Sequence, residues 1–305
     1  MKILIERARI KESYVVEIRK QFPDFEFLYD DVKLENIKDI DILMCRRVSI
    51  DLIENAKNLK VIFLPITGVD GIPMEYLKER KIPVINTHAK AKYIAERGIS
   101  LLFSAMGKVI PMDKNLRENK WANRSYTDLW YTVFNKKVAF YGYGHIGQEM
   151  ARLLQPFNIE ICTLSRHKGR CEVEAHKYFD NLEELADYCE VLLVSAPLNS
   201  GTKHTVNLDI LKRLNGHVVN VGRGSVIEEE SLFISLKEGI TKTAGIDVWY
   251  TYPKEKEDVA PSIYPYNTLE NVVMSPHTAW ATTEDEDIFL DETFEKLANY
   301  LKENY

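Results

Sequence analysis

The amino-acid sequence predicts an α/β fold with two doubly wound parallel sheets. Short apolar runs rich in β-branched residues alternate with longer amphipathic segments, which is typical of strand–helix–strand units. The apolar runs of the second half have no polar face, as expected for strands that helices cover on both sides. A length of 305 residues is enough for about two domains.

The first series of strands and helices starts at the N-terminus. We expect a helix at residues 9–21 and strands at 2–6, 25–29, 41–45 and 60–65. Residues 94–118 have the longest helical pattern before the middle of the chain. We therefore expect a first domain over residues 1–98 and a second over 99–280.

The second series starts after a polar, aromatic stretch at 119–132. It predicts a helix at 145–157 and strands at 136–142, 159–164, 191–197, 217–221 and 243–248. The last residues, 285–305, form an amphipathic helical pattern. Because chain termini often lie close together, this helix could pack on the first domain.

Composition excludes several function classes. Lys and Arg number 40 against 46 Asp and Glu, with no basic block, which disfavours a nucleic-acid partner. No apolar run reaches the ~20 residues of a membrane span, and the N-terminus has no signal-peptide pattern, so we expect a cytoplasmic protein. The four cysteines lack a CxxC pair, which argues for free buried thiols and against a metal site. Three glutamines among many Lys and Glu residues favour a thermophile.

A glycine motif follows the predicted strand 136–142. Gly142, Gly144 and Gly147 give G-x-G-x-x-G at the start of a helical pattern, the place that a dinucleotide-binding turn requires. Gly142 permits the tight turn, Gly144 lets the pyrophosphate approach the backbone, and Gly147 lets helix and strand pack closely. With His145 and Ile146, these residues are the candidate phosphate-binding loop of a Rossmann domain.

The next strand predicts which cofactor binds. NAD-binding domains carry an Asp or Glu about 20 residues after the motif, at the end of this strand. Here the strand ends in Ser165 and Arg166, followed by His167, Lys168 and Arg170. A serine hydroxyl and a guanidinium suit the 2′-phosphate of NADP. The sequence therefore predicts a preference for NADP(H), with NAD(H) as an alternative.

Several ordered motifs resemble the D-isomer-specific 2-hydroxyacid dehydrogenase family over almost the whole chain. They are KVIFLPITGVDGIPMEYLKERKIPVINT, AERGISLLFSAMGKVI, the glycine motif, SAPLNSGTKHTVN, VVNVGRGSVIEEESL, AGIDVW and VMSPHTAWAT. The resemblance implies a Rossmann cofactor domain, a flavodoxin-like substrate domain that residues 281–305 complete, and an active-site cleft between the two. It also implies a homodimer and a small 2-oxo acid as substrate.

The resemblance also implies roles for single residues. Arg223 would bind the substrate carboxylate and polarise the 2-oxo group, and its permanent charge and planar fork suit that task. His277 would be the acid/base group, because an imidazole exchanges protons near neutral pH. Substrate contacts would come from Thr67, Gly68 and Val69, and cofactor contacts from Pro197, Thr202, Val221, Asp247 and His277.

One catalytic position departs from the family pattern. Tyr252 stands before Pro253, where the family typically has Glu. A carboxylate would raise the pKa of a neighbouring imidazole, whereas a neutral phenol supplies no charge, so we expect a pH optimum for reduction on the acid side. Glu255 and Glu257 follow closely, but their spacing does not support a substitute role.

Two further features leave the function open. Trp280 could line the substrate pocket and favour an apolar 2-oxo acid, or pack at the domain hinge. Arg46 and Arg47 end an early strand and could recognise a second anionic group. The leading interpretation is an NADP(H)-dependent reductase of a glyoxylate- or hydroxypyruvate-like acid. The alternatives are a dinucleotide-sensing protein with weak turnover and a formate-like dehydrogenase that needs no acid/base step.

Overall fold

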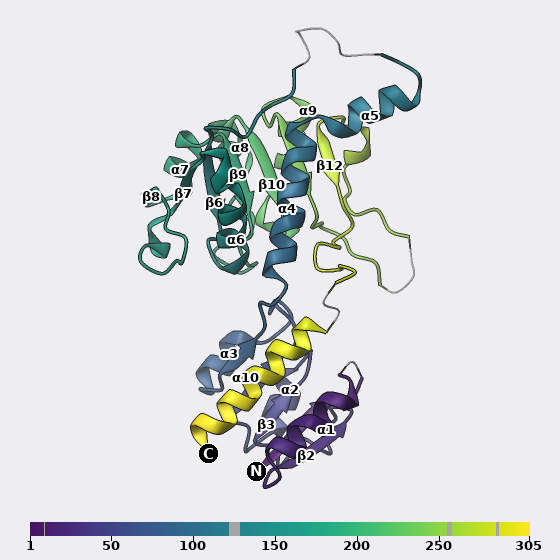
Figure 1. Cartoon of the computed structure of the whole chain (residues 1–305), viewed down its shortest axis with the longest axis vertical. Coiled ribbons are helices and arrows are strands. Elements are labelled where there is room, and N and C mark those ends of the chain that lie inside the picture. The colour runs from purple at the N-terminus through teal and green to yellow at the C-terminus, as the bar shows by residue number, and fades with distance from the viewer. Residues whose placement is uncertain (9, 122–128, 255–257, 285–286) are drawn as a thin grey trace. The chain divides into compact units, whose positions relative to one another are not determined.

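The computed structural model describes residues 1–8, 10–121, 129–254, 258–284 and 287–305. The chain forms two compact units, each with its own sheet (Figure 1). The smaller unit consists of Met1–Lys90 and Thr283–Tyr305, and the larger unit of Ala91–Thr282. The boundary expected near residue 98 falls inside a helix, α4 (Ala91–Met106), all of which belongs to the larger unit.

Five parallel strands form the sheet of the smaller unit, in the order β2-β1-β3-β4-β5. This is the order of flavodoxin-like sheets. The strands are β1 (Lys2–Glu6), β2 (Glu26–Asp30), β3 (Ile42–Met44), β4 (Val61–Leu64) and β5 (Val84–Asn86), and the helices are α1 (Glu12–Gln21), α2 (Ile50–Asn55), α3 (Met74–Glu79) and α10 (Ile288–Asn304).

The C-terminal helix α10 completes the core of the smaller unit. It lies beside α1 in Figure 1, although the two helices are at opposite ends of the chain. Four of its apolar residues recur at helical spacing and are buried with residues of β1, β3, β4 and α1, namely Leu290, Phe294, Leu297 and Leu301. Lys296 Nζ also donates to the Asn86 carbonyl at 2.8 Å, which joins α10 to the end of β5.

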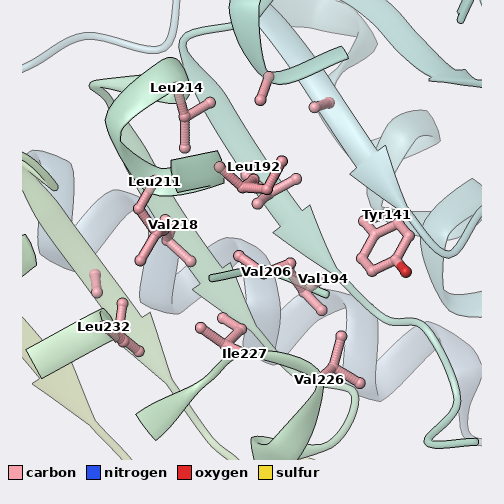
Figure 2. Close-up of a cluster of buried hydrophobic side chains, with 14 of the residues drawn as sticks. Tyr141, Leu192, Val194, Val206, Leu211, Leu214, Val218, Val226, Ile227 and Leu232 are labelled. Carbon is pink, nitrogen blue, oxygen red and sulfur yellow. The ribbon is translucent and has the colours of Figure 1, made fainter. Parts of the chain in front are cut away.

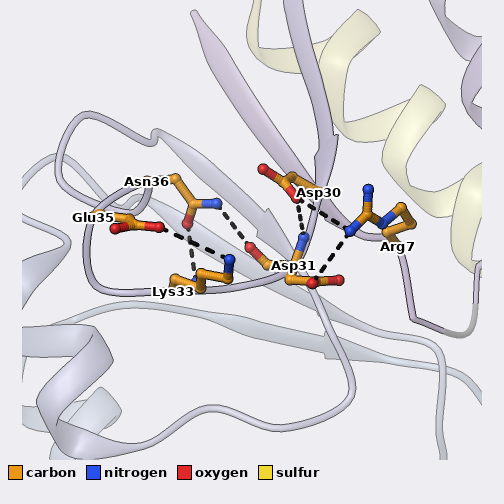
Figure 3. Close-up of polar contacts among 6 residues, drawn as sticks. All are labelled: Arg7, Asp30, Asp31, Lys33, Glu35 and Asn36. Carbon is orange, nitrogen blue, oxygen red and sulfur yellow. Dashed lines mark hydrogen bonds and ion pairs between the residues drawn. The ribbon is translucent and has the colours of Figure 1, made fainter.

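Charged and polar side chains shape the loop after β2 (Figure 3). Arg7 Nη2 lies 3.3 Å from Asp31 Oδ2 and 3.7 Å from Asp30 Oδ1. Asn36 Nδ2 donates to the Asp31 carbonyl at 2.7 Å and closes the loop. These side chains are largely exposed, so each ion pair contributes about 1 kcal/mol at most.

Seven parallel strands form the sheet of the larger unit, in the order β12-β11-β10-β9-β6-β7-β8. This is the Rossmann order with a seventh strand added, so the predicted fold class is confirmed. The strands are β6 (Lys137–Tyr141), β7 (Glu160–Leu164), β8 (Lys177–Phe179), β9 (Val191–Val194), β10 (His217–Asn220), β11 (Thr243–Ile246) and β12 (Val272–Met274). The helices besides α4 are α5 (Val109–Arg117), α6 (His145–Leu154), α7 (Leu182–Tyr188), α8 (Leu208–Leu214) and α9 (Glu229–Lys237).

Both faces of the central strands are buried. On one face, Leu192, Val194 and Val218 pack with residues of α8 and α9 (Figure 2). On the other face, Leu193 and Val219 pack with residues of α4 and α6. Helices on both sides therefore explain why these strands read as continuous apolar runs.

The helix expected at 94–118 is divided into α4 and α5. Pro111 explains the division, because its ring would clash with the carbonyl of Gly107 in a continuous helix. In α5 this proline lies in the first turn, where its missing N–H costs nothing. The short strands β5, β8 and β12, of three residues each, were not expected from the sequence.

The four cysteines are free thiols. Cys45, Cys162 and Cys189 are buried and Cys171 is half-buried. Within the described residues, no helix is long and apolar enough to cross a membrane.

Candidate functional site

The glycine motif forms the turn between β6 and α6. Gly142 has a φ of +99°, and a Cβ there would lie 2.3 Å from the Ala196 nitrogen. A Cβ at Gly147 would lie 2.3 Å from the Gly142 carbonyl oxygen. Both positions therefore require glycine, because backbone approaches them too closely for any side chain.

Gly144 has different surroundings. A Cβ there would meet no atom of the described residues within 4 Å. Gly144 is also the N-cap of α6, whose first residues, exposed His145 and half-buried Ile146, have backbone N–H groups without a helical acceptor. Open space beside a glycine at a helix N-terminus suits a pyrophosphate, so these residues fit the predicted dinucleotide.

An acidic side chain lies near the end of β7, although no Asp or Glu directly follows this strand in the sequence. Ser165 Oγ lies within hydrogen-bond distance of two acceptors, the Phe179 carbonyl at 2.9 Å and Asp180 Oδ1 at 2.8 Å. The Arg166 guanidinium lies 5.8 Å from the centre of the Tyr141 ring. An acid is therefore present here, but it comes from the end of β8. Motif spacing missed Asp180 because it examines only the end of the strand that follows the glycine turn.

The segment after β9 folds around Thr202. Thr202 is buried, and its Oγ1 donates to the Pro197 carbonyl at 2.6 Å and accepts from the Asn199 N–H at 2.9 Å. Pro197 is exposed at the start of the same loop. The Thr202 hydroxyl thus shapes the loop, and direct contact of either residue with a cofactor stays a prediction.

The last residue of β10, Asn220, folds the turn that carries Arg223. Its Nδ2 donates to the Arg223 carbonyl at 3.0 Å, and its Oδ1 accepts from the Gly222 N–H at 3.1 Å. Val221 is buried inside this turn. One amide side chain therefore fixes the backbone on both sides of Gly222.

Two glycines let other segments approach the Arg223 turn. A Cβ at Gly222 would lie 2.8 Å from the Ala196 carbonyl oxygen, and a Cβ at Gly224 would lie 2.2 Å from that of Trp249. Arg223 itself is half-buried, and its Nη1 donates to the Gly222 carbonyl at 2.8 Å. The turn after β10 is thus packed between the segments that follow β9 and β11.

Asp247 follows β11 and holds the turn that carries His277. Its buried carboxylate accepts hydrogen bonds from Ser275 Oγ and from the Thr278 and Ala279 N–H groups, the latter two at 3.2 Å each. His277 has a φ of +56°, which non-glycine residues seldom adopt. One carboxylate therefore stabilises an uncommon backbone conformation at the predicted acid/base residue.

Two indole N–H groups hold the same turn. Buried Trp249 donates from Nε1 to the Ser275 carbonyl at 2.8 Å. Trp280 is half-exposed and donates from Nε1 to the His277 carbonyl at 3.0 Å. This hydrogen bond orients the backbone of His277, and the predicted place of Trp280, in a substrate pocket or at the domain hinge, stays a prediction.

The ring of Tyr252 lies against the imidazole of His277. The ring centroids are 5.2 Å apart and the planes make an angle of 59°. The Tyr252 hydroxyl accepts a hydrogen bond from the Trp249 N–H at 3.0 Å. Tyr252 thus contributes an aromatic surface beside His277. Glu255 and Glu257, the two carboxylates that closely follow Tyr252 in the sequence, lie outside the described residues.

A mostly apolar cavity of about 450 Å³ adjoins this pair. Its lining includes Trp249, Tyr252, Val259, Met274, Pro276 and His277. Asp258 also lines this cavity. An imidazole beside mainly apolar walls suits a small organic ligand.

The strand order explains why Arg223, Asp247 and His277 lie along one edge of the sheet. β10, β11 and β12 are neighbours in a parallel sheet, so their carboxyl ends lie along one edge. Arg223 follows β10, Asp247 follows β11, and His277 follows β12. The glycine turn after β6 lies along the same edge, where α/β sheets bind their ligands.

In the smaller unit, the predicted substrate turn follows β4. Asn86 Nδ2 donates to the Thr67 carbonyl at 2.7 Å. Thr67 Oγ1 is buried and has no hydrogen-bond partner among the described residues. A buried hydroxyl without a partner costs about 1–3 kcal/mol, which a polar ligand would relieve.

A cavity of about 390 Å³ adjoins this turn. Arg46, Arg47, Ile66, Gly68, Gly71 and Ile72 line it. The acidic side chain of Glu6 is also near, since its Oε2 accepts from the Arg46 N–H at 3.0 Å. The two arginines of the sequence prediction are thus brought together with Gly68, and Val69 follows in the same turn.

This fold and site define a dinucleotide-binding α/β protein. Residues 99–279 match the sequence profile described as "D-isomer specific 2-hydroxyacid dehydrogenase, NAD binding domain". The chain is also 30% identical over 302 residues to a glyoxylate reductase of Pyrococcus furiosus. The aligned part covers 93% of this chain and 87% of the relative. The chain therefore belongs to the D-isomer specific 2-hydroxyacid dehydrogenase family, whose members are oxidoreductases.

Solved structures have the same two-sheet fold. A protein of Pyrococcus horikoshii superposes with a TM-score of 0.82 at 25% identity, over 99% of this chain and 91% of that one. The NADPH-dependent glyoxylate/hydroxypyruvate reductase of Sinorhizobium meliloti, in complex with NADP and malonate, superposes with a TM-score of 0.74 at 23% identity, over 98% and 93% of the two chains.

We expect Tyr252→Glu to extend the family's reductive activity to higher pH. A carboxylate beside the imidazole stabilises its protonated form, so the proton donor for reduction stays charged as the pH rises. The alkaline limb of the pH profile of kcat/KM should move up by about one pH unit. Tyr252→Phe keeps the ring and should leave this limb in place. If the alkaline limb of the pH profile did not move in Tyr252→Glu, the result would contradict a contact between this position and the imidazole of His277.

Proposed function

We propose that this protein reduces a small 2-oxo acid, of the glyoxylate or hydroxypyruvate kind, with NADP(H) preferred and NAD(H) as an alternative. The observation that carries the proposal is the placement of Arg223 and His277 along the sheet edge that also holds the open Gly144 turn. A permanent cation, an imidazole and a dinucleotide loop are the groups that this reduction requires.

The chemistry divides between two side chains. The nicotinamide supplies hydride when it is bound. Arg223 binds the substrate carboxylate through its planar fork and polarises the 2-oxo group. His277 donates a proton to the oxygen of that group during reduction and accepts it during oxidation. Tyr252 and Asp247 are positioning residues, since one packs on the imidazole and the other holds its backbone.

In the smaller unit we assign substrate contacts to Thr67, Gly68 and Val69. Backbone N–H groups in a turn with a glycine suit a carboxylate, and the unpartnered Thr67 hydroxyl supports a polar ligand here. Arg46 and Arg47 line the adjoining cavity and would favour acids with a second anionic group.

Cofactor contacts are assigned to the larger unit. The pyrophosphate is assigned to the turn Gly142–Gly147 and Arg166 to the 2′-phosphate, and the remaining candidates are Ser165, Pro197, Thr202, Val221, Asp247 and His277. The NADP-bound reductase of the same fold supports this preference.

A panel of 2-oxo acids tests the activity. We expect NADPH oxidation with glyoxylate or hydroxypyruvate, and a loss of about a hundredfold or more in kcat/KM for Arg223→Ala. The Kd for NADPH should not change. Arg213→Ala, on the exposed side of α8, is the matched control. Tight NADPH binding without turnover of any acid would instead support a dinucleotide sensor, and reduction of NADP⁺ by formate would support a formate dehydrogenase.

Arg166→Ala tests the cofactor preference. Loss of a charge-assisted contact should raise the Kd for NADPH about tenfold and leave that for NADH nearly unchanged. Titration of nicotinamide fluorescence measures both constants. Arg152→Ala, which removes an exposed guanidinium from α6, should alter neither. Equal weakening of the two cofactors would show that Arg166 does not contact the 2′-phosphate.

We also propose that the protein is a homodimer. Large apolar side chains are exposed close together in sequence on α5 and in the described part of the segment that follows, among them Val109, Ile110, Leu116, Trp121, Leu129, Trp130 and Phe134. Exposed apolar side chains in such number support an interface, because contiguous apolar surface on a protein usually marks one.

Sedimentation equilibrium measures this assembly. Wild-type protein should have the mass of a dimer, and Trp130→Asp should shift it toward the monomer, because a buried charge without a partner is unfavourable. Ile263→Asp introduces the same charge at a site that is 81% exposed and should remain dimeric. A monomeric wild-type protein would overturn the proposal.

A further inference from the structure

The structure places the carboxylate of Asp180 next to the end of β7, where the sequence has no acidic residue. In dinucleotide-binding sheets, an acid at the end of the strand after the glycine turn binds the adenosine ribose. Here that strand is β7, and Ser165 directly follows its last residue, Leu164. Leu164 pairs with Phe179 of β8, so Asp180 is the next residue along the neighbouring strand. The 2.8 Å between Ser165 Oγ and Asp180 Oδ1 follows from this register.

The hydrogen-bonding groups at this place are mainly acceptors. Ser165 has one hydroxyl hydrogen, and both oxygens within its reach, Asp180 Oδ1 and the Phe179 carbonyl, are acceptors. To a ligand the pair therefore offers oxygen lone pairs and a negative charge. The free 2′- and 3′-hydroxyls of NAD(H) supply matching donors, whereas the 2′-phosphate of NADP(H) supplies acceptors and a like charge.

Arg166 has the opposite preference. Its guanidinium is adjacent in sequence to Ser165 and suits a phosphate. Burial and the charges of Arg166 and Arg170 lower the pKa of His167, which disfavours a positive charge on this imidazole. The choice between NAD(H) and NADP(H) at this end of the site therefore depends on the balance between the negative charge of Asp180 and the positive charge of flanking residues such as Arg166.

We propose that Asp180 is a specificity-determining residue of the cofactor site. Its carboxylate takes the place of the missing ribose-binding acid, admits NAD(H), and limits the preference for NADP(H) that Arg166 creates. This inference rests on the cofactor site proposed above, and it is independent of which acid is the substrate.

The test is the binding of NADH and NADPH to the full-length Asp180→Asn protein without substrate. Asparagine keeps the shape of the side chain and removes its charge. We expect the ratio of the Kd for NADH to the Kd for NADPH to rise about tenfold or more. Asp187→Asn removes a carboxylate from α7 that pairs with Arg213 instead, and should leave the ratio within about twofold.

Two adenosine fragments test the contact with the ribose in the absence of the nicotinamide end of the cofactor. Adenosine 2′,5′-bisphosphate and 5′-AMP differ only in the 2′-phosphate, and their Kd ratio should shift in the same direction as that of the cofactors. Ser165→Ala removes the hydroxyl that orients Asp180 and should cause a smaller shift of the same sign.

The alternative is that the Ser165–Asp180 hydrogen bond only joins two strand ends. In that case Asp180→Asn would leave the ratio of the two Kd values unchanged, whether or not Tm falls, and the proposal would be overturned. A shifted ratio in a protein that reduces no 2-oxo acid would uphold Asp180 and overturn only the reductase. An unchanged ratio in an active reductase would overturn Asp180 alone.

Discussion

The buried carboxylate of Asp247 is the constraint on which the geometry of the sheet edge around His277 depends. A carboxylate withdrawn from water is costly unless donors surround it, and here one hydroxyl and two backbone N–H groups do so. These donors belong to the turn around His277, so satisfying the carboxylate also determines the path of the backbone there. The uncommon φ of +56° at His277 lies within the turn that these hydrogen bonds hold in place.

The same edge shows how a parallel sheet converts sequence order into a site. Segments far apart in the chain end side by side because β9, β10, β11 and β12 are neighbours in register. Their connections approach so closely that Gly222 and Gly224 have no room for a Cβ. Glycine is therefore required at both positions for the strand ends to pack together, and this packing keeps Arg223 at the edge of the sheet.

Local patterns were sufficient to predict the fold class and the glycine turn, because continuous apolar strands and a G-x-G-x-x-G turn are local consequences of sheet burial and phosphate binding. The division of α4 from α5 could also have been predicted from Pro111. Asp180 could not, since its importance depends on which residue of β8 pairs with Leu164. Nor does the sequence show that the Tyr252 hydroxyl bonds the Trp249 N–H while its ring faces His277, because that orientation depends on tertiary packing.

The absence of an acidic residue from the end of β7 is weak evidence for a changed cofactor preference, because a neighbouring strand can supply the acid. A ribose responds to the charge and the acceptors near its hydroxyls, not to the strand that supplies them. Adjacent parallel strands end within hydrogen-bond distance of each other, so an acid lost from β7 can be supplied by β8. Here Ser165 connects the two positions, because its hydroxyl lies within hydrogen-bond distance of the Asp180 carboxylate. With the cofactor placed as proposed above, a 2′-phosphate would meet the combined charge of Asp180 and Arg166, which the end of β7 alone does not reveal.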